Sequence, residues 1–151
     1  MIRTLAKKFN REFDWYVAIT RGGLVPCCLL SKLTGMQQID TFCINSYVEG
    51  QQRDPRMSLK SFSHLHGQSV LIVDDLVDSG DTMMLAVMTI RKLGSPTLIQ
   101  TATLFKKDGS SFTPDYFVHA VPANEWLIFP WEVNETIPQG KTRTITWELL
   151  N

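Results

Sequence analysis

Cysteine is scarce in this chain, and the placement of its three cysteines excludes a cysteine-ligated metal site. Cys27 and Cys28 are neighbours in an apolar stretch with a helical pattern, and Cys43 falls in an expected strand. Structural zinc sites instead need ligand pairs about two to four residues apart. We therefore expect three buried, reduced thiols.

Net charge is absent as well, since 15 Lys and Arg residues balance 15 Asp and Glu residues. A chain without an overall positive field has no general attraction to nucleic acid or to anionic membranes. No apolar run approaches the roughly 18 residues of a membrane span, and the chain does not begin with a secretory pattern. We expect a cytoplasmic protein with no nucleic-acid or membrane partner.

Internal repeats, linkers and low-complexity segments are missing too. The chain has 151 residues, of which 44% are hydrophobic, enough for one packed core. We therefore predict a single domain over residues 1–151.

Apolar periodicity predicts alternating strands and helices. Strands are expected at residues 15–20, 39–47, 70–73, 97–105, 115–121 and 126–129. Helices are expected at residues 1–11, at 24–33 with Gly35 ending the helix, and at 81–93 with Met84, Leu85, Met88 and Leu93 facing inward. The polar segment 48–67 is expected to be a long loop, of the kind that often carries function. Strands that alternate with helices predict an α/β fold with a parallel sheet and with ligands at the carboxyl ends of its strands.

Residues 70–82 are the most informative stretch, because they combine a buried strand, three acids and an anion-binding turn. Asp74 and Asp75 come where the apolar strand runs out, Asp78 follows, and residues 79–82 open an apolar helix. Free backbone amides and the helix dipole at such a turn favour a phosphate. Paired acids beside it suggest a ligand that has hydroxyls to hold and a phosphate to anchor, as a ribose 5-phosphate has.

These thirteen residues resemble the phosphoribosyl-pyrophosphate (PRPP) signature of type I phosphoribosyltransferases. The resemblance implies that Asp74 and Asp75 hold the ribose hydroxyls, directly or through Mg²⁺, and that Asp78 is the general acid/base at the purine imidazole edge. It assigns the 5-phosphate to Ser79, Gly80, Asp81 and Thr82. Response-regulator receiver domains also carry paired acids after an apolar strand, but theirs lie on the first strand, whereas about 70 residues precede these.

Two further stretches match the same family. Thr20, Arg21, Gly22 and Gly23 resemble its pyrophosphate loop, although alone they would be read as a plain turn. Ser46 and Tyr47 resemble the start of the mobile catalytic loop of the 6-oxopurine branch, which closes over the reacting centre and excludes water. Arg53 aligns with a basic residue of that loop, and a solvated loop arginine is the alternative.

The last part of the resemblance is a base pocket. It lies in a small base-binding hood, expected mainly at residues 106–133. Lys107 matches the lysine that donates to the purine 6-oxygen, although the adjacent Lys106 leaves the alignment open by one residue. Trp126 and Leu127 match the family's aromatic-aliphatic pair. In that pair the aromatic ring stacks on the base, and the backbone carbonyl of the aliphatic residue accepts a hydrogen bond from the purine 2-position. Glu132, in Pro130-Trp131-Glu132, stands where the family has Asp, which puts a metal role of Glu132 in doubt. Asp75 is therefore the first candidate for a metal ligand, and Asp74 and Glu132 are further candidates.

Together these motifs imply a type I phosphoribosyltransferase fold with helices on both faces of the sheet. They imply a Mg²⁺-dependent enzyme that transfers 5-phosphoribosyl from PRPP to a 6-oxopurine (guanine, xanthine or hypoxanthine) as a homo-oligomer, dimer or tetramer. The alternative is a non-catalytic PRPP or nucleotide sensor acting on nucleic acid, which the zero net charge disfavours. An orotate or pyrimidine enzyme is disfavoured by Lys107, Trp126 and Leu127.

The end of the chain resembles the start of the family's first helix. Thr146-Trp147-Glu148 has the family's Thr/Ser-Trp-Asp/Glu pattern, and Met1 placed after Asn151 would continue one apolar helical face. The sequence therefore resembles a circular permutation, in which residues 140–151 complete the first helix in the same chain or in a neighbour. This hypothesis requires Trp147 and Leu149 to pack with Ile2 and Leu5, and a coincidental C-terminal turn is the alternative.

Overall fold

The computed structural model describes residues 1–48, 51–57, 61–132 and 141–150, and at 45–48 and 51–57 it describes the backbone alone. None of the helices in these residues is long and apolar enough to cross a membrane.

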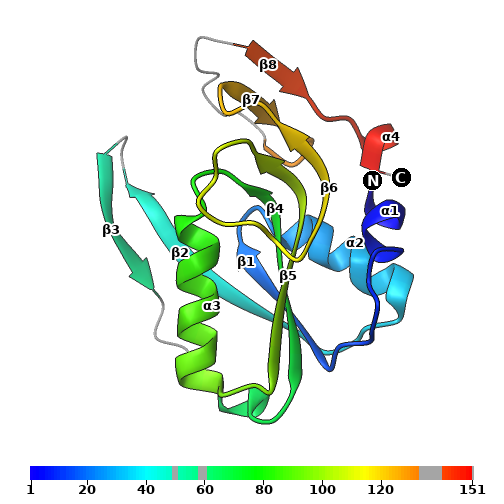
Figure 1. Ribbon diagram of the computed structural model, residues 1–151, viewed down its shortest axis with the longest axis vertical. Coiled ribbons are helices and arrows are strands. Elements are labelled where there is room, and N and C mark those ends of the chain that lie inside the picture. Colours follow the sequence, from blue (N-terminus) through cyan, green and yellow to red (C-terminus); the bar gives the residue numbers. More distant parts are fainter. Residues whose placement is uncertain (49–50, 58–60, 133–140, 151) are drawn as a thin grey trace.

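A six-stranded sheet forms the centre of the molecule, with the strand order β3-β2-β1-β4-β5-β6 (Figure 1). The strands are β1 (Trp15–Thr20), β2 (Ile39–Val48), β3 (Gln51–Met57), β4 (Ser69–Val77), β5 (Leu98–Lys107) and β6 (Tyr116–Val121). All are parallel except β3, which runs antiparallel to β2 at the sheet edge. The predicted parallel α/β fold is confirmed.

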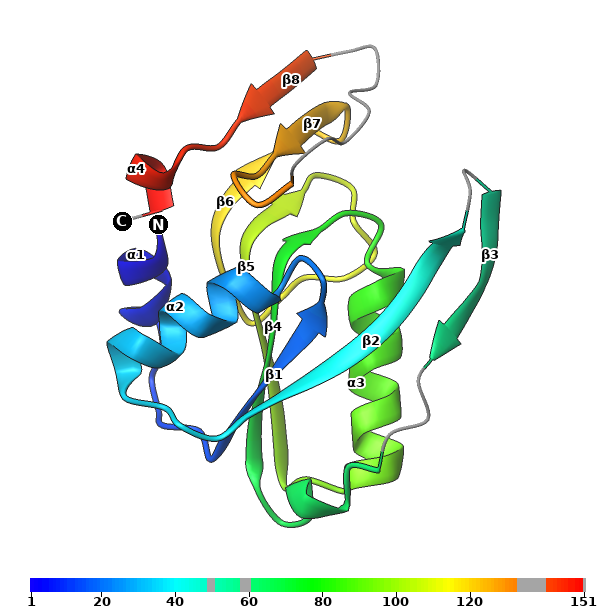
Figure 2. The ribbon, with the colours of Figure 1, turned by 180° about the vertical axis from the view of Figure 1, so that it is seen from behind.

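Helices cover both faces of the sheet, as Figures 1 and 2 show. On one face α1 (Ile2–Ala6) and α2 (Leu24–Thr34) share a core with Leu71 and Val73 of β4, and on the other α3 (Asp81–Gly94) shares a core with Val70 and Ile72. Successive β4 side chains therefore enter opposite cores, as the period of a strand requires. Gly35 ends α2 with a φ of 78°, which confirms the predicted helix end.

The predicted inward face of α3 is wrong by about one residue. Met84, Met88 and Leu93 are 40%, 63% and 43% exposed, and Leu85 is half-buried. The buried stripe is instead Met83, Ala86, Thr89 and Ile90. Two neighbouring apolar stripes with helical spacing run along this sequence, and only packing against β4 selects between them.

The predicted loop at 48–67 contains the edge strand β3 and the short 3₁₀ helix η1 (Ser63–Leu65). The polar sequence of β3 lacks the apolar alternation of a half-buried strand, and Pro55 is tolerated because β3 lies at the edge. The strand β3 forms because it pairs with β2, and the sequence pattern did not predict this pairing.

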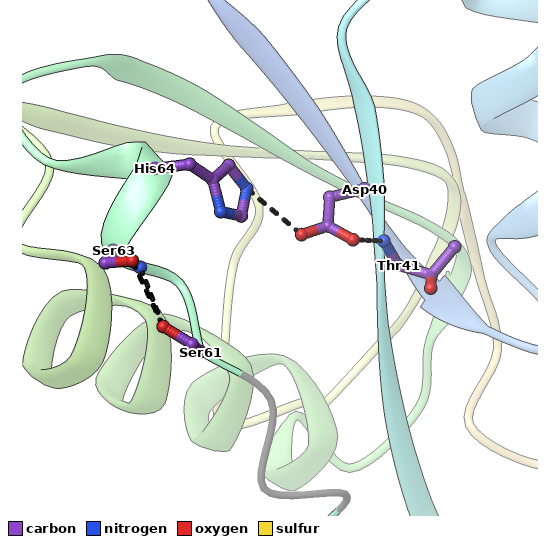
Figure 3. A network of polar contacts seen from close by, with 5 residues as sticks. All are labelled: Asp40, Thr41, Ser61, Ser63 and His64. Atoms are coloured by element: carbon purple, nitrogen blue, oxygen red, sulfur yellow. Dashed lines mark hydrogen bonds and ion pairs between the residues drawn. The ribbon is translucent and has the colours of Figure 1, made fainter.

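A polar contact holds η1 against the sheet (Figure 3). His64 Nε2 lies 3.1 Å from Asp40 Oδ2 at the start of β2, and the His64 ring meets Trp15 edge-on at 4.6 Å between centroids. The Thr41 amide donates to Asp40 Oδ1 (2.6 Å), and Ser61 Oγ donates to Ser63 Oγ (3.1 Å). These contacts fix the path of the chain from the β3 region into β4.

A second, two-stranded parallel sheet lies beyond β6 and consists of β7 (Glu125–Ile128) and β8 (Lys141–Thr144). Arg143 joins the two strands, because its Nε lies 2.9 Å from Glu125 Oε1 and its Nη2 donates to Oε2 (3.2 Å). Glu125 is 2% exposed and Arg143 is 46% exposed, so Arg143 pairs a buried carboxylate with a cation at the surface. β8 has no apolar pattern of its own, and the sequence did not predict it.

The last helix, α4 (Trp147–Leu150), lies end-on to α1 in both ribbon views. The Met1 amino group donates to the carbonyls of Leu149 (3.0 Å) and Leu150 (3.3 Å). The predicted end-on placement is therefore confirmed. The predicted packing is wrong, because Trp147 and Leu149 are each 52% exposed and the buried residue of α4 is Leu150.

Two smaller expectations also change. α1 ends at Ala6 rather than near residue 11, and Phe9 beyond it packs edge-on against Phe13 and Tyr116. All three cysteines are free, but only Cys27 is buried, which raises the pKa of its thiol to about 12, whereas Cys28 is exposed.

Candidate active site

The chemistry-bearing residues gather at the carboxyl ends of three neighbouring parallel strands. β1 leads into Arg21, Gly22 and Gly23, β4 carries Asp74 and Asp75 and leads into α3, and β5 ends at Lys107. The order β1-β4-β5 in the sheet places these segments side by side (Figure 2). This is the edge at which parallel α/β sheets bind their ligands.

Asp74 and Asp75 are adjacent buried carboxylates, each 8% exposed. β4 continues past them to Val77, so they lie inside the strand rather than after it. Burial raises the pKa of Asp75 to about 6, and a hydrogen bond from the Trp131 indole N–H to Asp75 Oδ2 (3.4 Å) acts in the opposite direction. Burial, followed by the charge of Asp75, raises the pKa of Asp74 well above its usual value. Such a pair favours a bound cation or hydroxyl donors.

The glycines of the loop after β1 are required by close packing. A Cβ at Gly22 would lie 2.5 Å from Asp75 Oδ2, and one at Gly23 would lie 2.3 Å from the Val73 carbonyl oxygen. The loop backbone therefore rests directly on the acids of β4. Arg21 is exposed, its peptide bond to Thr20 is cis, and the Thr20 hydroxyl donates to the Phe42 carbonyl (3.4 Å).

The turn between β4 and α3, which the sequence predicts to bind a phosphate, is held from two sides. Gly80 has a φ of 105°, and the Ser79 hydroxyl donates to Asp81 Oδ2 (2.8 Å). Ser111 donates to the Ser79 carbonyl from both its amide (2.8 Å) and its hydroxyl (2.7 Å). A cavity of about 100 Å³ opens between this turn and the acids, lined among others by Asp74, Asp78, Ser79, Gly80 and Thr82. The start of α3 thus offers backbone amides at a small cavity, as phosphate sites do.

Lys107 and Asp78 form an ion pair beside Trp126. Lys107 is 6% exposed, and its ammonium donates to Asp78 Oδ2 at 2.7 Å. The Asp78 side chain is 61% exposed, so the pair joins a buried cation to an accessible carboxylate. Lys107 Nζ also lies 5.6 Å from the Trp126 ring centroid, within cation–π range. The Lys106 ammonium instead donates to the Lys107 carbonyl (3.2 Å).

Of the predicted hood residues, Trp126 lies beside this pair. Trp126 is half-buried in β7, and Leu127 is 4% exposed. Among the described residues the Trp126 indole N–H is buried and has no hydrogen-bond partner. The carboxylate of Glu132 accepts from the Phe129 amide (2.7 Å) and so closes the turn at 129–132.

Metal ligation stays a prediction. Across the described ranges, His, Cys, Asp and Glu side chains gather nowhere in a group of three that could hold a metal ion. Ligation by Asp75, with Asp74 or Glu132, would therefore need further oxygens from a substrate or from water.

The three residues assigned to a mobile loop lie where only the backbone is described. Ser46 and Tyr47 fall in β2, and Arg53 falls in β3. Their side chains lie outside the described residues, so their roles stay predictions.

Two contacts in the site were not foreseen. The Trp131 indole N–H reaches Asp75. Ser111 holds the turn after β4 from 32 residues away, and no local pattern marks such a contact. A tryptophan three residues after β7 was the one signal available for the first contact.

Comparison with known proteins matches this arrangement. A family model described as a phosphoribosyl transferase domain matches residues 1–136. The chain is 37% identical over 131 residues to a xanthine-guanine phosphoribosyltransferase of Gluconobacter oxydans, covering 85% of this chain and 74% of that protein. Among solved structures, a purine phosphoribosyltransferase of Pyrococcus horikoshii aligns with a TM-score of 0.78 and 30% identity, over 91% of each chain. A Helicobacter pylori xanthine-guanine-hypoxanthine phosphoribosyltransferase shares the fold, with a TM-score of 0.75 and 23% identity over 87% and 86% of the two chains.

Proposed function

The chain belongs to the phosphoribosyl transferase family, and from that premise we propose that it transfers 5-phosphoribosyl from PRPP to N9 of a 6-oxopurine. In this reaction the bond from ribose C1 to pyrophosphate breaks, the bond from C1 to N9 forms, and the base loses a proton. The products are a purine nucleoside 5-monophosphate and pyrophosphate, so the enzyme would serve purine salvage.

The observation that carries the proposal is the Lys107–Asp78 pair beside Trp126, next to the diacid and the phosphate turn. The Lys107 ammonium can donate hydrogen bonds but cannot accept them. It therefore favours a purine with a 6-oxo group, which accepts, over one with a 6-amino group, which donates. Asp78 is accessible, and it would take the proton that the base loses at its imidazole edge. Trp126 offers an aromatic face to the base.

The remaining residues would hold PRPP and stabilise the reacting centre. Positive charge develops at ribose C1 as pyrophosphate leaves, and the carboxylates of Asp74 and Asp75 oppose it with negative charge. The turn at 79–82 would take the 5-phosphate, and Arg21 with the amides of Gly22 and Gly23 would take the pyrophosphate. Holding PRPP and the base in this geometry would make a bimolecular reaction effectively unimolecular, which lowers the entropic part of its barrier.

Mg²⁺ fits this donor set. Two adjacent buried carboxylates with raised pKa values are relieved by a cation, and Mg²⁺ prefers one or two carboxylates together with substrate oxygens. Asp75, with Asp74 beside it, would hold the ion. A bound ion would supply positive charge against the charge of the leaving pyrophosphate.

A substrate panel tests the proposal. The purified protein is incubated with PRPP and Mg²⁺ and with guanine, xanthine, hypoxanthine, adenine or orotate, and pyrophosphate release is measured. We expect release with at least one 6-oxopurine and little with adenine or orotate. PRPP binding without release in any reaction would contradict catalysis and favour the sensor alternative, and adenine as the best substrate would contradict the role of Lys107.

A further inference from the structure

We propose that Trp131 and Trp147 are positioning residues for Asp75. In this arrangement Trp147 of α4 supports the Trp131 ring, and the Trp131 indole N–H fixes the Asp75 carboxylate for PRPP. The inference rests on the proposed function, because it assigns Asp75 to PRPP. It adds two residues from the C-terminal part of the chain to the site.

The first link is the hydrogen bond between Trp131 and Asp75. The indole N–H donates to Asp75 Oδ2 at 3.4 Å, across 56 residues of sequence. The carboxylate is 8% exposed, and the Gly22 backbone lies so close that no Cβ fits there. A buried carboxylate with few donors depends on each of them for its orientation.

The second link is the packing of the Trp131 ring. Phe129 stacks on it with centroids 4.9 Å apart and planes at 11°, and Trp147 contacts it at 6.0 Å and 56°. Phe129 is 3% exposed and belongs to the core, so it is a rigid support. Trp147 is the second aromatic support and comes from a different element.

The third link is the anchoring of α4. Leu150 is 2% exposed, and the carbonyls of Leu149 and Leu150 accept hydrogen bonds from the Met1 amino group. Ile145, just before α4, is also 2% exposed. The backbone that carries Trp147 is thus fixed although its side chain is half in solvent, as a supporting residue requires.

The contact itself is tested without any substrate. The protein has four tryptophans, so a ¹⁵N-labelled sample gives four indole N–H resonances, assigned by single Trp→Phe variants. We expect Asp75→Asn to shift the Trp131 resonance and to leave that of Trp15 unchanged, because Trp15 packs against His64 away from the site. A Trp131 resonance that does not respond to Asp75→Asn would overturn the first link.

The functional link is tested by PRPP binding and by kinetics in the full chain. Trp131→Phe keeps a ring and removes the N–H, so we expect the Kd and KM for PRPP to rise about tenfold, with the KM of the base within about twofold. Trp147→Ala should raise the KM for PRPP about threefold, and Trp147→Phe should restore it. Leu149→Ala is the matched control, because Leu149 lies on the same helix and is equally exposed, and it should leave both constants unchanged.

The outcomes separate this inference from the proposed function. Wild-type protein that binds PRPP but transfers it to no purine would contradict the function and leave the comparison of the PRPP Kd values of the variants valid. Wild-type protein that does not bind PRPP overturns both. Trp131→Phe with unchanged PRPP binding overturns the positioning role alone, and equal effects of Trp147→Ala and Leu149→Ala overturn the role of Trp147. Thermal unfolding of each variant excludes loss of fold as the cause.

Discussion

At the scale of single residues, the free protein pairs the two groups that its proposed reaction needs to separate. Lys107 Nζ and Asp78 Oδ2 are 2.7 Å apart, and Lys107 is buried while Asp78 is accessible. A buried ammonium without a partner is costly, so Asp78 satisfies Lys107 until a base arrives. The 6-oxygen of a purine can replace one hydrogen bond to Lys107, which leaves Asp78 available for the imidazole edge.

Asp78→Asn tests the proton-transfer role. Asn retains an oxygen that can accept from Lys107 but is no base at neutral pH, so kcat should fall about 10²- to 10⁴-fold. The KM for PRPP should change little, because Asp78 is not among the residues proposed to hold PRPP. Steady-state kinetics with both substrates varied provide the measurement. Turnover near that of the wild type would remove Asp78 from this role.

Lys107→Ala and Lys106→Ala test which lysine selects the base. Lys107 is buried beside Trp126 and Asp78, whereas the Lys106 ammonium donates to the Lys107 carbonyl. Lys107→Ala should therefore raise the KM for 6-oxopurines at least about tenfold, as loss of a charged donor predicts, and should raise the KM for PRPP far less. Lys106→Ala is the control and should change both constants less than about twofold. The reverse result would mean that the alignment is displaced by one residue.

At the scale of elements, the turn at residues 79–82, proposed to bind the 5-phosphate, depends on a neighbouring loop as much as on its own sequence. Gly80 has a φ of 105°, and a Cβ there would lie 2.7 Å from the backbone nitrogen of Phe112. Gly109 also has a positive φ, 79°, but nothing lies within 4 Å of its Cβ position. A side chain would therefore be strained by the positive φ at either position, but it would also be crowded only at Gly80.

Gly80→Ala should raise the KM for PRPP more than about tenfold, because the turn must move away from Ser111 and Phe112. Strain alone should cost Gly109→Ala roughly 1 kcal/mol of unfolding free energy, with the KM for PRPP unchanged. Urea unfolding and steady-state kinetics on both variants give the comparison. Equal KM values for the two variants would show that crowding at Gly80 is unimportant.

The end-on contact of α4 with α1 makes a second prediction at this scale. Leu150 is 2% exposed and Leu149 is 52% exposed, although both belong to one four-residue helix. Leu150→Ala should therefore lower the free energy of unfolding by about 2–4 kcal/mol, and Leu149→Ala should change it by less than about 0.5 kcal/mol. Urea unfolding monitored by circular dichroism measures both. Similar losses for the two variants would contradict the observed orientation of α4.

Elements also show how far the sequence leads. The strand over residues 15–20 and the helix ended by Gly35 were predicted with correct or nearly correct bounds, because local chemistry sets them. β3 and β8 were missed because their polar sequences are strands only through pairing with β2 and β7. The face of α3 was missed because Met83 and Met84 both lie on apolar stripes, and only the sheet distinguishes them.

At the scale of the whole molecule, sheet topology assembles the site. The segments after β1, β4 and β5 are separated by up to about 85 residues, yet the order β1-β4-β5 makes them neighbours. The sequence could name Asp74, Asp78 and Lys107 through motifs. It could not supply the Trp131–Asp75 contact, because that contact depends on where the hood folds back over the sheet.

The same assembly places a destabilising group in the core. Folding raises the pKa of Asp75 from 3.8 to about 6, so between these values the folded state binds more protons than the unfolded state. The contribution of Asp75 to stability therefore falls as pH rises through this window, and its full cost is present above about pH 6. Asp74, whose pKa is raised partly by the charge of Asp75, is relieved when Asp75 is neutral.

Asp75→Asn should therefore stabilise the ligand-free protein while weakening its proposed function. A shift from 3.8 to about 6 corresponds to about 2–3 kcal/mol, so the variant should exceed the wild type in unfolding free energy by up to that amount at pH 8. The difference should shrink as the pH falls through 6 and vanish only below about pH 3, where the folded and unfolded wild-type protein both hold the proton. Urea unfolding at pH 3, 6 and 8 in the presence of a chelator measures it. Saturating PRPP with Mg²⁺ should reverse the order at pH 8, because ligand binding stabilises only a protein that retains the site. An advantage for the variant that grows as pH falls would contradict the raised pKa of Asp75.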